Sequence, residues 1–465
     1  MPAGRRGQAQ LLAGIVRLLA ARQRGNLLAV TDEAQRLQAM AEAPEAAQYD
    51  LAPATRAALG EDLHALALIS LGEAEYWTVR FEDASRHLER GIALARRIGR
   101  PYLEFTGLAH LAAAQLYRSH ARAAELGRQA VELAERHGWT DDPALGVAST
   151  ILGLVLVGQA RQDEAEAWVR RGERTITAET AQPAMFAGIR YVRGVVEMAR
   201  DHDAEALAAF GAAEQLARRL AAPHYLISRI RAWLLRSLLR LGQTDRAGLF
   251  LAGLSGEERE RGEIRVAAAE VELAQGNPSA ALAELAALQE GPGSGYYWGF
   301  WQVRADVLEA IAGDELGDPD AAETALERAL DLAEPNGTLL PFLLYPVPGR
   351  LLERHARHGT AHAALIADIL SLLAGNRSAP PPAGPRSPLE PLSDSEIRVL
   401  RYLPTNLTGP EIAGELYVSV NTVRTHMRHL YAKLGTHRRA ETVARARSLG
   451  LLAPSPHRGQ ATRPG

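Results

Sequence analysis

Apolar residues recur every three or four positions through most of residues 1–374, which is the spacing of amphipathic helices. The helical stretches come in pairs, and an alanine marks the second stretch of successive pairs about every forty residues. These alanines are Ala84, Ala123, Ala165, Ala206 and Ala247, and Ala281 and Ala322 continue the series. A two-helix unit at this spacing predicts a helical solenoid, and an irregular helical bundle is the less favoured alternative.

Four of the predicted pairs have clear limits in the sequence. They are 63–77 with 81–98, 101–116 with 121–137, 143–157 with 162–176, and 183–198 with 203–220. A weaker pair is expected earlier in the chain, over about 8–43. Each alanine is explained if the two helices of a pair cross closely there, because a small side chain lets their backbones approach.

The first helix of a pair usually lines the concave side of such an array, where peptides, partner proteins or small effectors bind. The aromatic residues in predicted first helices are therefore candidate contacts, although packing in the core is favoured for most of them: Trp77, Tyr117, Tyr191 and Trp233. Residues 291–298 interrupt the pattern with glycine, proline and aromatic residues. We interpret them as structural filler, with an effector-binding lip as the less favoured alternative.

A shorter pattern in residues 390–452 predicts four helices, of which the central two are joined by a tight turn. Thr408 caps the first of these two, and its apolar side is Ile412, Ala413 and Leu416. Ser419 caps the second, whose apolar positions are Val423, Met427, Leu430 and Leu434. At about 100° per residue the opposite side is polar and suited to a DNA major groove, with Asn421, Arg424, Thr425 and Arg428.

Several separated blocks of this segment resemble the LuxR-type helix-turn-helix family in residue type and spacing. They are Leu392-Ser393-x-x-Glu396, Glu411-Ile412-Ala413-x-x-Leu416, Thr422-Val423-x-x-His426 and Lys433-Leu434-Gly435. The segment departs from the family at Asn406, where glycine is usual, and at Gly409-Pro410, where asparagine and a basic residue are common. The paired helices upstream resemble the tetratricopeptide-type array of MalT-like regulators.

The resemblance implies a DNA-binding domain, and it supports Arg424 most strongly as a contact. The full set of DNA-binding candidates is Thr408, Asn421, Thr422, Arg424, Thr425, Arg428 and Lys433. In this family the fourth helix commonly pairs with its twin, which makes Val443 and Ala444 candidates for a dimer contact. Double-stranded DNA and RNA polymerase are the partners that the resemblance implies.

Charge supports this assignment locally. The whole chain has a formal net charge of −3, whereas residues 392–452 hold nine basic and five acidic residues, a net of +4 that leaves −7 for the rest. Positive charge is thus concentrated where phosphate binding needs it.

Several kinds of chemistry are excluded or disfavoured. The chain has no cysteine, and Lys433 is its only lysine, so it holds neither a Walker A loop nor a response-regulator receiver. His355, His358 and His362 have helix-compatible spacing, but we favour a solvated face over a metal site. No catalytic residue, cofactor or metal is expected. No segment approaches about twenty uninterrupted apolar residues, so we expect a cytoplasmic protein without a membrane partner.

These observations predict an all-α protein. A tetratricopeptide-like solenoid occupies residues 1–374, a proline-rich linker 375–389, a four-helix LuxR-type domain 390–452 and a disordered tail 453–465. We expect a DNA-binding transcriptional regulator, with an effector or partner on the solenoid that controls DNA binding or dimerisation, and with a possible homodimer on DNA. The alternatives are a helical-repeat adaptor and the DNA-binding half of a split ATPase-type regulator.

Overall fold

The computed structural model describes residues 13–42 apart from 23 and 25, then 53–116, 118–177, 183–219, 226–290, 300–345, 348–374 and, with gaps, 394–446. Within these residues every regular element is a helix, which confirms the predicted all-α class. The chain divides into two compact units, residues 1–376 and 377–465. The predicted linker 375–389 and tail 453–465 lie outside the described residues, and the boundary between the units falls in the former.

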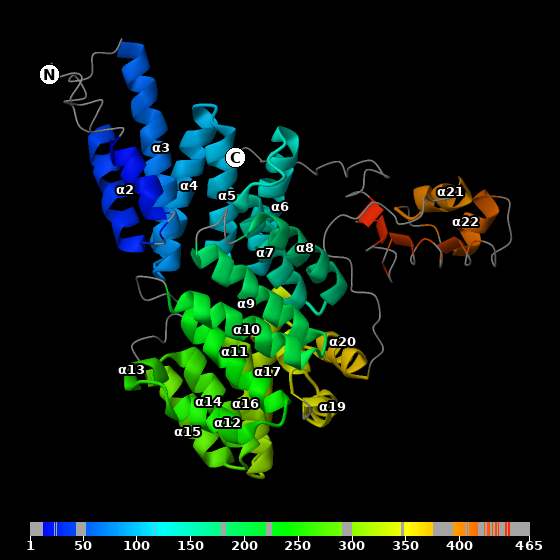
Figure 1. Ribbon diagram of the computed structural model, residues 1–465. Helices are drawn as coiled ribbons and strands as arrows, with labels where there is room; N and C mark the ends of the chain where they lie inside the picture. Colours follow the sequence, from blue (N-terminus) through cyan, green and yellow to red (C-terminus); the bar gives the residue numbers. More distant parts are fainter. Residues whose placement is uncertain are drawn as a thin grey trace, which may run out of the picture. The chain divides into compact units, whose positions relative to one another are not determined.

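The described part of the first unit starts with a helical segment, 13–22, and continues through helices that follow one another in pairs (Figure 1). The helices are α2 (Leu27–Glu42), α3 (Pro53–Trp77), α4 (Phe81–Arg97), α5 (Pro101–Gln115), α6 (His120–His137), α7 (Pro143–Gly158), α8 (Gln162–Thr175), α9 (Pro183–Ala199), α10 (Asp203–Ala217), α11 (Leu226–Arg240), α12 (Thr244–Ala252), α13 (Gly256–Arg259), α14 (Gly262–Ala274), α15 (Pro278–Glu290), α16 (Phe300–Glu315) and α17 (Pro319–Ala333). After them come the 3-10 turn η2 (Glu334–Asn336), α18 (Leu340–Leu343), α19 (Pro348–His358) and α20 (Ala363–Leu373).

The predicted helix pairs are confirmed, with ends that differ by a few residues except at α3, which begins ten residues earlier. Local signals explain several of these ends. Ser119 caps α6 by accepting a hydrogen bond from the Arg122 backbone N–H, and Gly138 ends that helix with a left-handed backbone. Asp142 caps α7, and Pro143 occupies its first position.

The alanine series marks the crossing of the two helices in each pair. All seven alanines are buried, with at most 1% of their surface exposed. Glycines in first helices face several of them: a Cβ atom on Gly72 would lie 3.0 Å from the Ala84 carbonyl oxygen, and one on Gly313 would lie 3.2 Å from the Ala322 backbone nitrogen. Close approach of two backbones therefore explains both the alanines and the glycines that face them.

The first helices of successive pairs form an inner layer. Helices α3, α5, α7, α9, α11, α14 and α16 each contact the next first helix in the series, in addition to their own partner. Second helices contact mainly the helices directly before and after them in the chain. First helices therefore lie closer together than second helices, which is the arrangement expected of the concave side of a solenoid.

The described part of the second unit has α21 (Asp394–Tyr402) and α22 (Gly409–Glu415), with further helical residues between 423 and 446. It has a separate hydrophobic core, described below with the candidate site. Among the described helices of the whole chain, none is long and apolar enough to cross a membrane.

Candidate DNA-binding domain and solenoid channel

The core of the C-terminal unit is built from the positions that the helical pattern assigned to the inside. Ile412 and Ala413 of α22 are buried, and Leu416 is partly buried at the end of that helix. From α21, Val399, Leu400 and Leu403 join the same cluster. The two helices therefore pack through the faces predicted for them.

The apolar stripe of the recognition segment also faces this core. Val423, Leu430 and Leu434 are almost fully buried, and Met427 is partly buried against them. Most of the DNA-binding candidates lie outside the described part of the chain: Thr408, Asn421, Thr422, Arg424, Thr425 and Arg428. Their contacts with DNA stay a prediction.

Lys433, the remaining candidate, lies within the described residues. Its ammonium group donates a hydrogen bond of 2.9 Å to Glu396, a buried carboxylate at the start of α21. This ion pair ties the end of the recognition segment to α21, and it accounts for Lys433 without a phosphate contact. Next to it, the hydroxyls of Thr436 and Thr442 share a hydrogen bond of 2.7 Å.

The predicted dimer contact is not favoured by the position of Val443. This side chain is 8% exposed and belongs to the core of its own unit. A residue that already packs inside a unit has little surface to offer a second copy. Ala444 lies outside the described residues, so the dimer contact stays a prediction.

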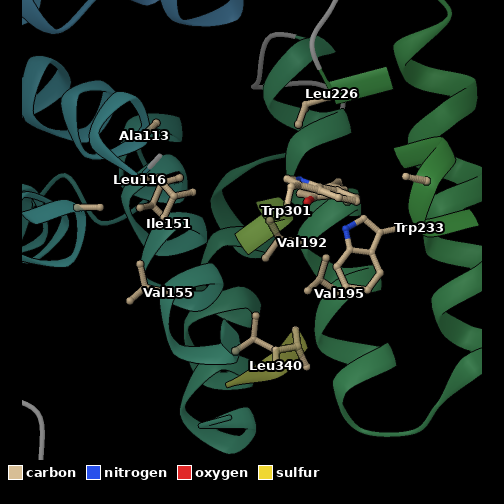
Figure 2. Packing of buried hydrophobic residues seen from close by; sticks show 14 of the residues in the cluster. Ala113, Leu116, Ile151, Val155, Val192, Val195, Leu226, Trp233, Trp301 and Leu340 are labelled. Carbon is tan, nitrogen blue, oxygen red and sulfur yellow. The ribbon is translucent and has the colours of Figure 1, made fainter. Parts of the chain in front are cut away.

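The solenoid holds a second candidate site along its inner layer, which we call the channel. A small cavity of about 50 Å³ is lined by residues of first helices, including Leu154, Tyr191 and Trp233, and by Leu340 of α18. Figure 2 shows Val195, Trp233 and Leu340 of this lining among the buried hydrophobic residues around them. Tyr191 and Trp233 therefore serve both as core residues and as channel lining. Trp77 is buried, and Tyr117 and residues 291–298 lie outside the described residues.

Buried charges line the channel farther along, and none of the sequence patterns above predicted them. Arg304 is completely buried between the rings of Trp233 and Trp301, with its guanidinium carbon 4.7 and 4.5 Å from their centres. It donates hydrogen bonds to Glu270 and, at 3.3 Å, to the Tyr345 hydroxyl. Burial alone would lower the pKa of Arg304, but Glu270 and Tyr345 outweigh it and raise the pKa, so the guanidinium stays charged.

The amino-acid sequence of α11 contains a pattern that indicates buried charges. Arg229, Arg231 and Arg236 stand among Leu, Ile and Trp residues, and all three are at most 8% exposed. Charged residues on several sides of a mostly apolar helix have to be paired inside the protein. The sequence pattern therefore predicts that these arginines are paired, but it does not predict which carboxylates are their partners.

The histidine cluster requires a correction, because His355 and His362 do not form a solvated face. They are 6% and 5% exposed, and only His358 is on the surface. Their partners are carboxylates of α17 and η2: His355 contacts Glu327, and His362 lies 2.7 Å from Glu334 and 2.9 Å from Asp331. Burial would lower the pKa of His362, but these hydrogen bonds outweigh it and raise the pKa. The sequence did not show that α19 would pack against α17. No described group of residues could hold a metal ion.

The paired helices of the first unit and the separate helical core of the second define a helical-repeat protein in which a small helical domain follows the repeats. Residues 34–348 match the family described as the MalT-like TPR region, and residues 390–446 match the bacterial regulatory proteins of the LuxR family. The chain therefore belongs to the MalT-like TPR family, with a LuxR-family domain following the repeats, as the sequence motifs predicted.

Curated relatives are similar over short stretches. The chain is 35% identical over 92 residues to a nitrate/nitrite response regulator protein homolog of Haemophilus influenzae, and 44% identical over 70 residues to a probable transcriptional regulatory protein NarL of Mycobacterium tuberculosis. It is 42% identical over 59 residues to the HTH-type transcriptional regulator MalT of Serratia proteamaculans. These matches cover 20%, 15% and 13% of this chain and 41%, 32% and 6% of the respective relatives, so the chain spans less than half the length of each.

Proposed function

We propose that this chain is a sequence-specific DNA-binding transcriptional regulator. The observation that carries the proposal is the packing of the recognition segment, whose apolar stripe of Val423, Leu430 and Leu434 is buried in the C-terminal core. If the segment continues as one helix, Arg424 and Arg428 project away from that core, where guanine edges or phosphates can be reached. The names of the relatives, which include transcriptional regulators, agree with this function.

The second part of the proposal concerns the solenoid. An effector or partner protein on the channel biases dimerisation or the availability of the DNA-binding domain, which then occupies a promoter and contacts RNA polymerase. Support comes from the lining of the channel, which combines aromatic residues with buried charges, the composition common in ligand sites. An adaptor protein would bind its partner in the same channel. A test that distinguishes a regulator from an adaptor therefore has to measure DNA binding.

The test is DNA occupancy across the genome for the wild-type chain and for an Arg424→Ala/Arg428→Ala variant. We expect discrete peaks for the wild type and at least about a tenfold loss in the variant, because each specific arginine contact with a base contributes roughly 1–3 kcal/mol. An Arg86→Ala/Arg122→Ala variant is the control, since it removes the same charge from exposed positions of the solenoid. Circular dichroism checks that all three proteins are folded.

Peaks that persist in the double variant would contradict the assignment of the recognition residues. Equal and featureless occupancy in all three proteins would favour the adaptor. A copurifying ATPase subunit would support the split-regulator alternative.

A further inference from the structure

Residues 334–345, which we call the strap, leave the helix-pair pattern after α17 and run back along the channel. At one end the strap contacts α6 and α7, which lie far from it in the sequence. The Asn336 side-chain oxygen accepts a hydrogen bond of 3.0 Å from the His120 backbone N–H at the start of α6. The Leu339 backbone N–H donates a bond of 2.8 Å to the Gly158 carbonyl at the end of α7.

At its other end the strap is held by the buried charges of the channel. Arg236 donates a hydrogen bond to the Leu344 carbonyl, and its guanidinium lies 4.2 Å from the centre of the Tyr345 ring. The Tyr345 hydroxyl donates to Glu270. Burial raises the pKa of Tyr345, so this hydroxyl remains a proton donor. Leu340, Phe342 and Leu344 are at most 4% exposed.

The strap does not fill the channel completely. The cavity of about 50 Å³ lies beside Leu340, and a larger one of about 560 Å³ is lined by Leu343, Leu344 and Tyr345 together with α11, α14 and α16. A cavity of the larger size accommodates a small ligand or several peptide side chains.

Polar atoms around the strap are also incompletely satisfied. Among the described residues, no hydrogen-bond partner is found for Arg236 Nε, Glu270 Oε2 or Arg304 Nη1, or for Thr338 Oγ1 within the strap itself. A buried polar atom without a partner makes the structure less stable than one in which it is bonded. An occupant that bonds these atoms better would therefore compete with the strap.

We propose that the strap is an internal ligand of the channel, and that a partner peptide acts by replacing it. The strap defines the chemistry of that peptide. It carries apolar side chains for the space beside α7 and α16, a backbone carbonyl for Arg236, and a hydroxyl donor, as in tyrosine, for Glu270. The partner is thus an apolar segment that forms a helical turn, as α18 does, and carries a tyrosine after it.

Replacement of the strap would affect α20, the last helix of the first unit, through direct contacts. Helix α18 contacts α20, and Leu373, the last residue of α20, lines the larger cavity together with Leu344 and Tyr345. Release of the strap removes one wall from α20, and three residues after Leu373 the chain leaves this unit. This step rests on the proposed function, because it identifies the partner and the coupling of the same channel.

The experiment uses the full chain and a fluorescein-labelled peptide with the sequence of residues 336–345. Tyr345→Phe removes the hydrogen bond to Glu270, and Leu340→Ala weakens the opposite end of the strap. Leu88→Ala is the matched control, because it removes a fully buried side chain from α4, away from the strap. Fluorescence anisotropy measures peptide binding, and hydrogen–deuterium exchange of the Leu339 amide, which bonds to Gly158, measures strap release.

We expect both strap variants to bind the peptide about tenfold or more tightly than the wild type, because Tyr345→Phe loses a hydrogen bond to a charged group and Leu340→Ala loses buried apolar packing that holds the strap. Exchange at Leu339 accelerates in both, whereas Leu88→Ala matches the wild type in peptide affinity. The proposal is overturned if the variants open the strap without binding the peptide, or if Leu339 exchanges only together with the core of α16. No DNA takes part, so failure here is distinct from failure of the DNA-occupancy test.

Discussion

His120 lies at the first position of α6, and its imidazole faces the channel beside Leu340 of the strap. Burial lowers the pKa of His120 to about 4, and a hydrogen bond of its imidazole with the backbone of Asn336 offsets only part of that effect. The imidazole is therefore neutral at neutral pH. In the unfolded chain the same residue takes up a proton near pH 6.5.

This difference sets the sign of a pH dependence. Between pH 6.5 and 4 the unfolded state binds more protons at His120 than the folded state, so stability is complete above this window and falls as the pH falls through it. We expect the solenoid to lose about 2 kcal/mol between pH 7 and pH 5 through this residue. In His120→Gln this part of the loss disappears. Urea unfolding at both pH values measures it, with His137→Gln, an exposed histidine, as the control. An unchanged pH difference in His120→Gln would refute the assignment.

Other residue-scale features were only partly visible in the sequence. Val423, Leu430 and Leu434 were assigned correctly to the inside, because helical spacing alone determines that they share a face. The pairing of Lys433 with Glu396, and of Arg304 with Glu270, was not predicted. The partners are 37 and 34 residues apart, and nothing in either sequence segment specifies the other.

At the scale of elements, six of the described turns within helix pairs contain a residue with a left-handed backbone conformation. Positive φ angles occur at Val79, Ala160 and Asp201, and the corresponding turns of later pairs have glycine, at Gly242, Gly276 and Gly317. A left-handed backbone is unfavourable for a residue with a Cβ atom, and glycine adopts it without that penalty. The turns at Val79, Ala160 and Asp201 are therefore strained, whereas the three glycine turns are not.

Ala160→Gly should stabilise the solenoid by about 0.5–1 kcal/mol, because it removes this strain at a φ of 58°. The matched control is Ala208→Gly, an exposed position in the middle of α10, which should destabilise by about 0.5–1 kcal/mol through lost helix propensity. Thermal unfolding of both variants against the wild type makes the comparison. A destabilised Ala160→Gly protein would show that strain at this turn is not the controlling factor.

At the scale of the whole molecule, the two compact units have separate hydrophobic cores. We expect two unfolding transitions in calorimetry. Leu430→Ala leaves a cavity in the C-terminal core and should shift only one transition to lower temperature, and Leu235→Ala in α11 should shift only the other. Each substitution should lower the unfolding free energy of its own unit by about 2–5 kcal/mol. If each variant lowers both transitions equally, the units are coupled and the division is incorrect.

The sequence by itself determined the all-α class, the helix pairs with their alanine-marked crossings, and the apolar faces of the C-terminal helices. These features follow from short-range periodicity, since residues three or four apart on a helix share a face. Only the tertiary structure decided that the strap returns to the channel, that Arg236 and Arg304 meet Glu270 and Tyr345 there, and that His355 and His362 are buried against α17. These contacts join residues far apart in the chain, and they depend on how the helices stack, which local spacing does not contain.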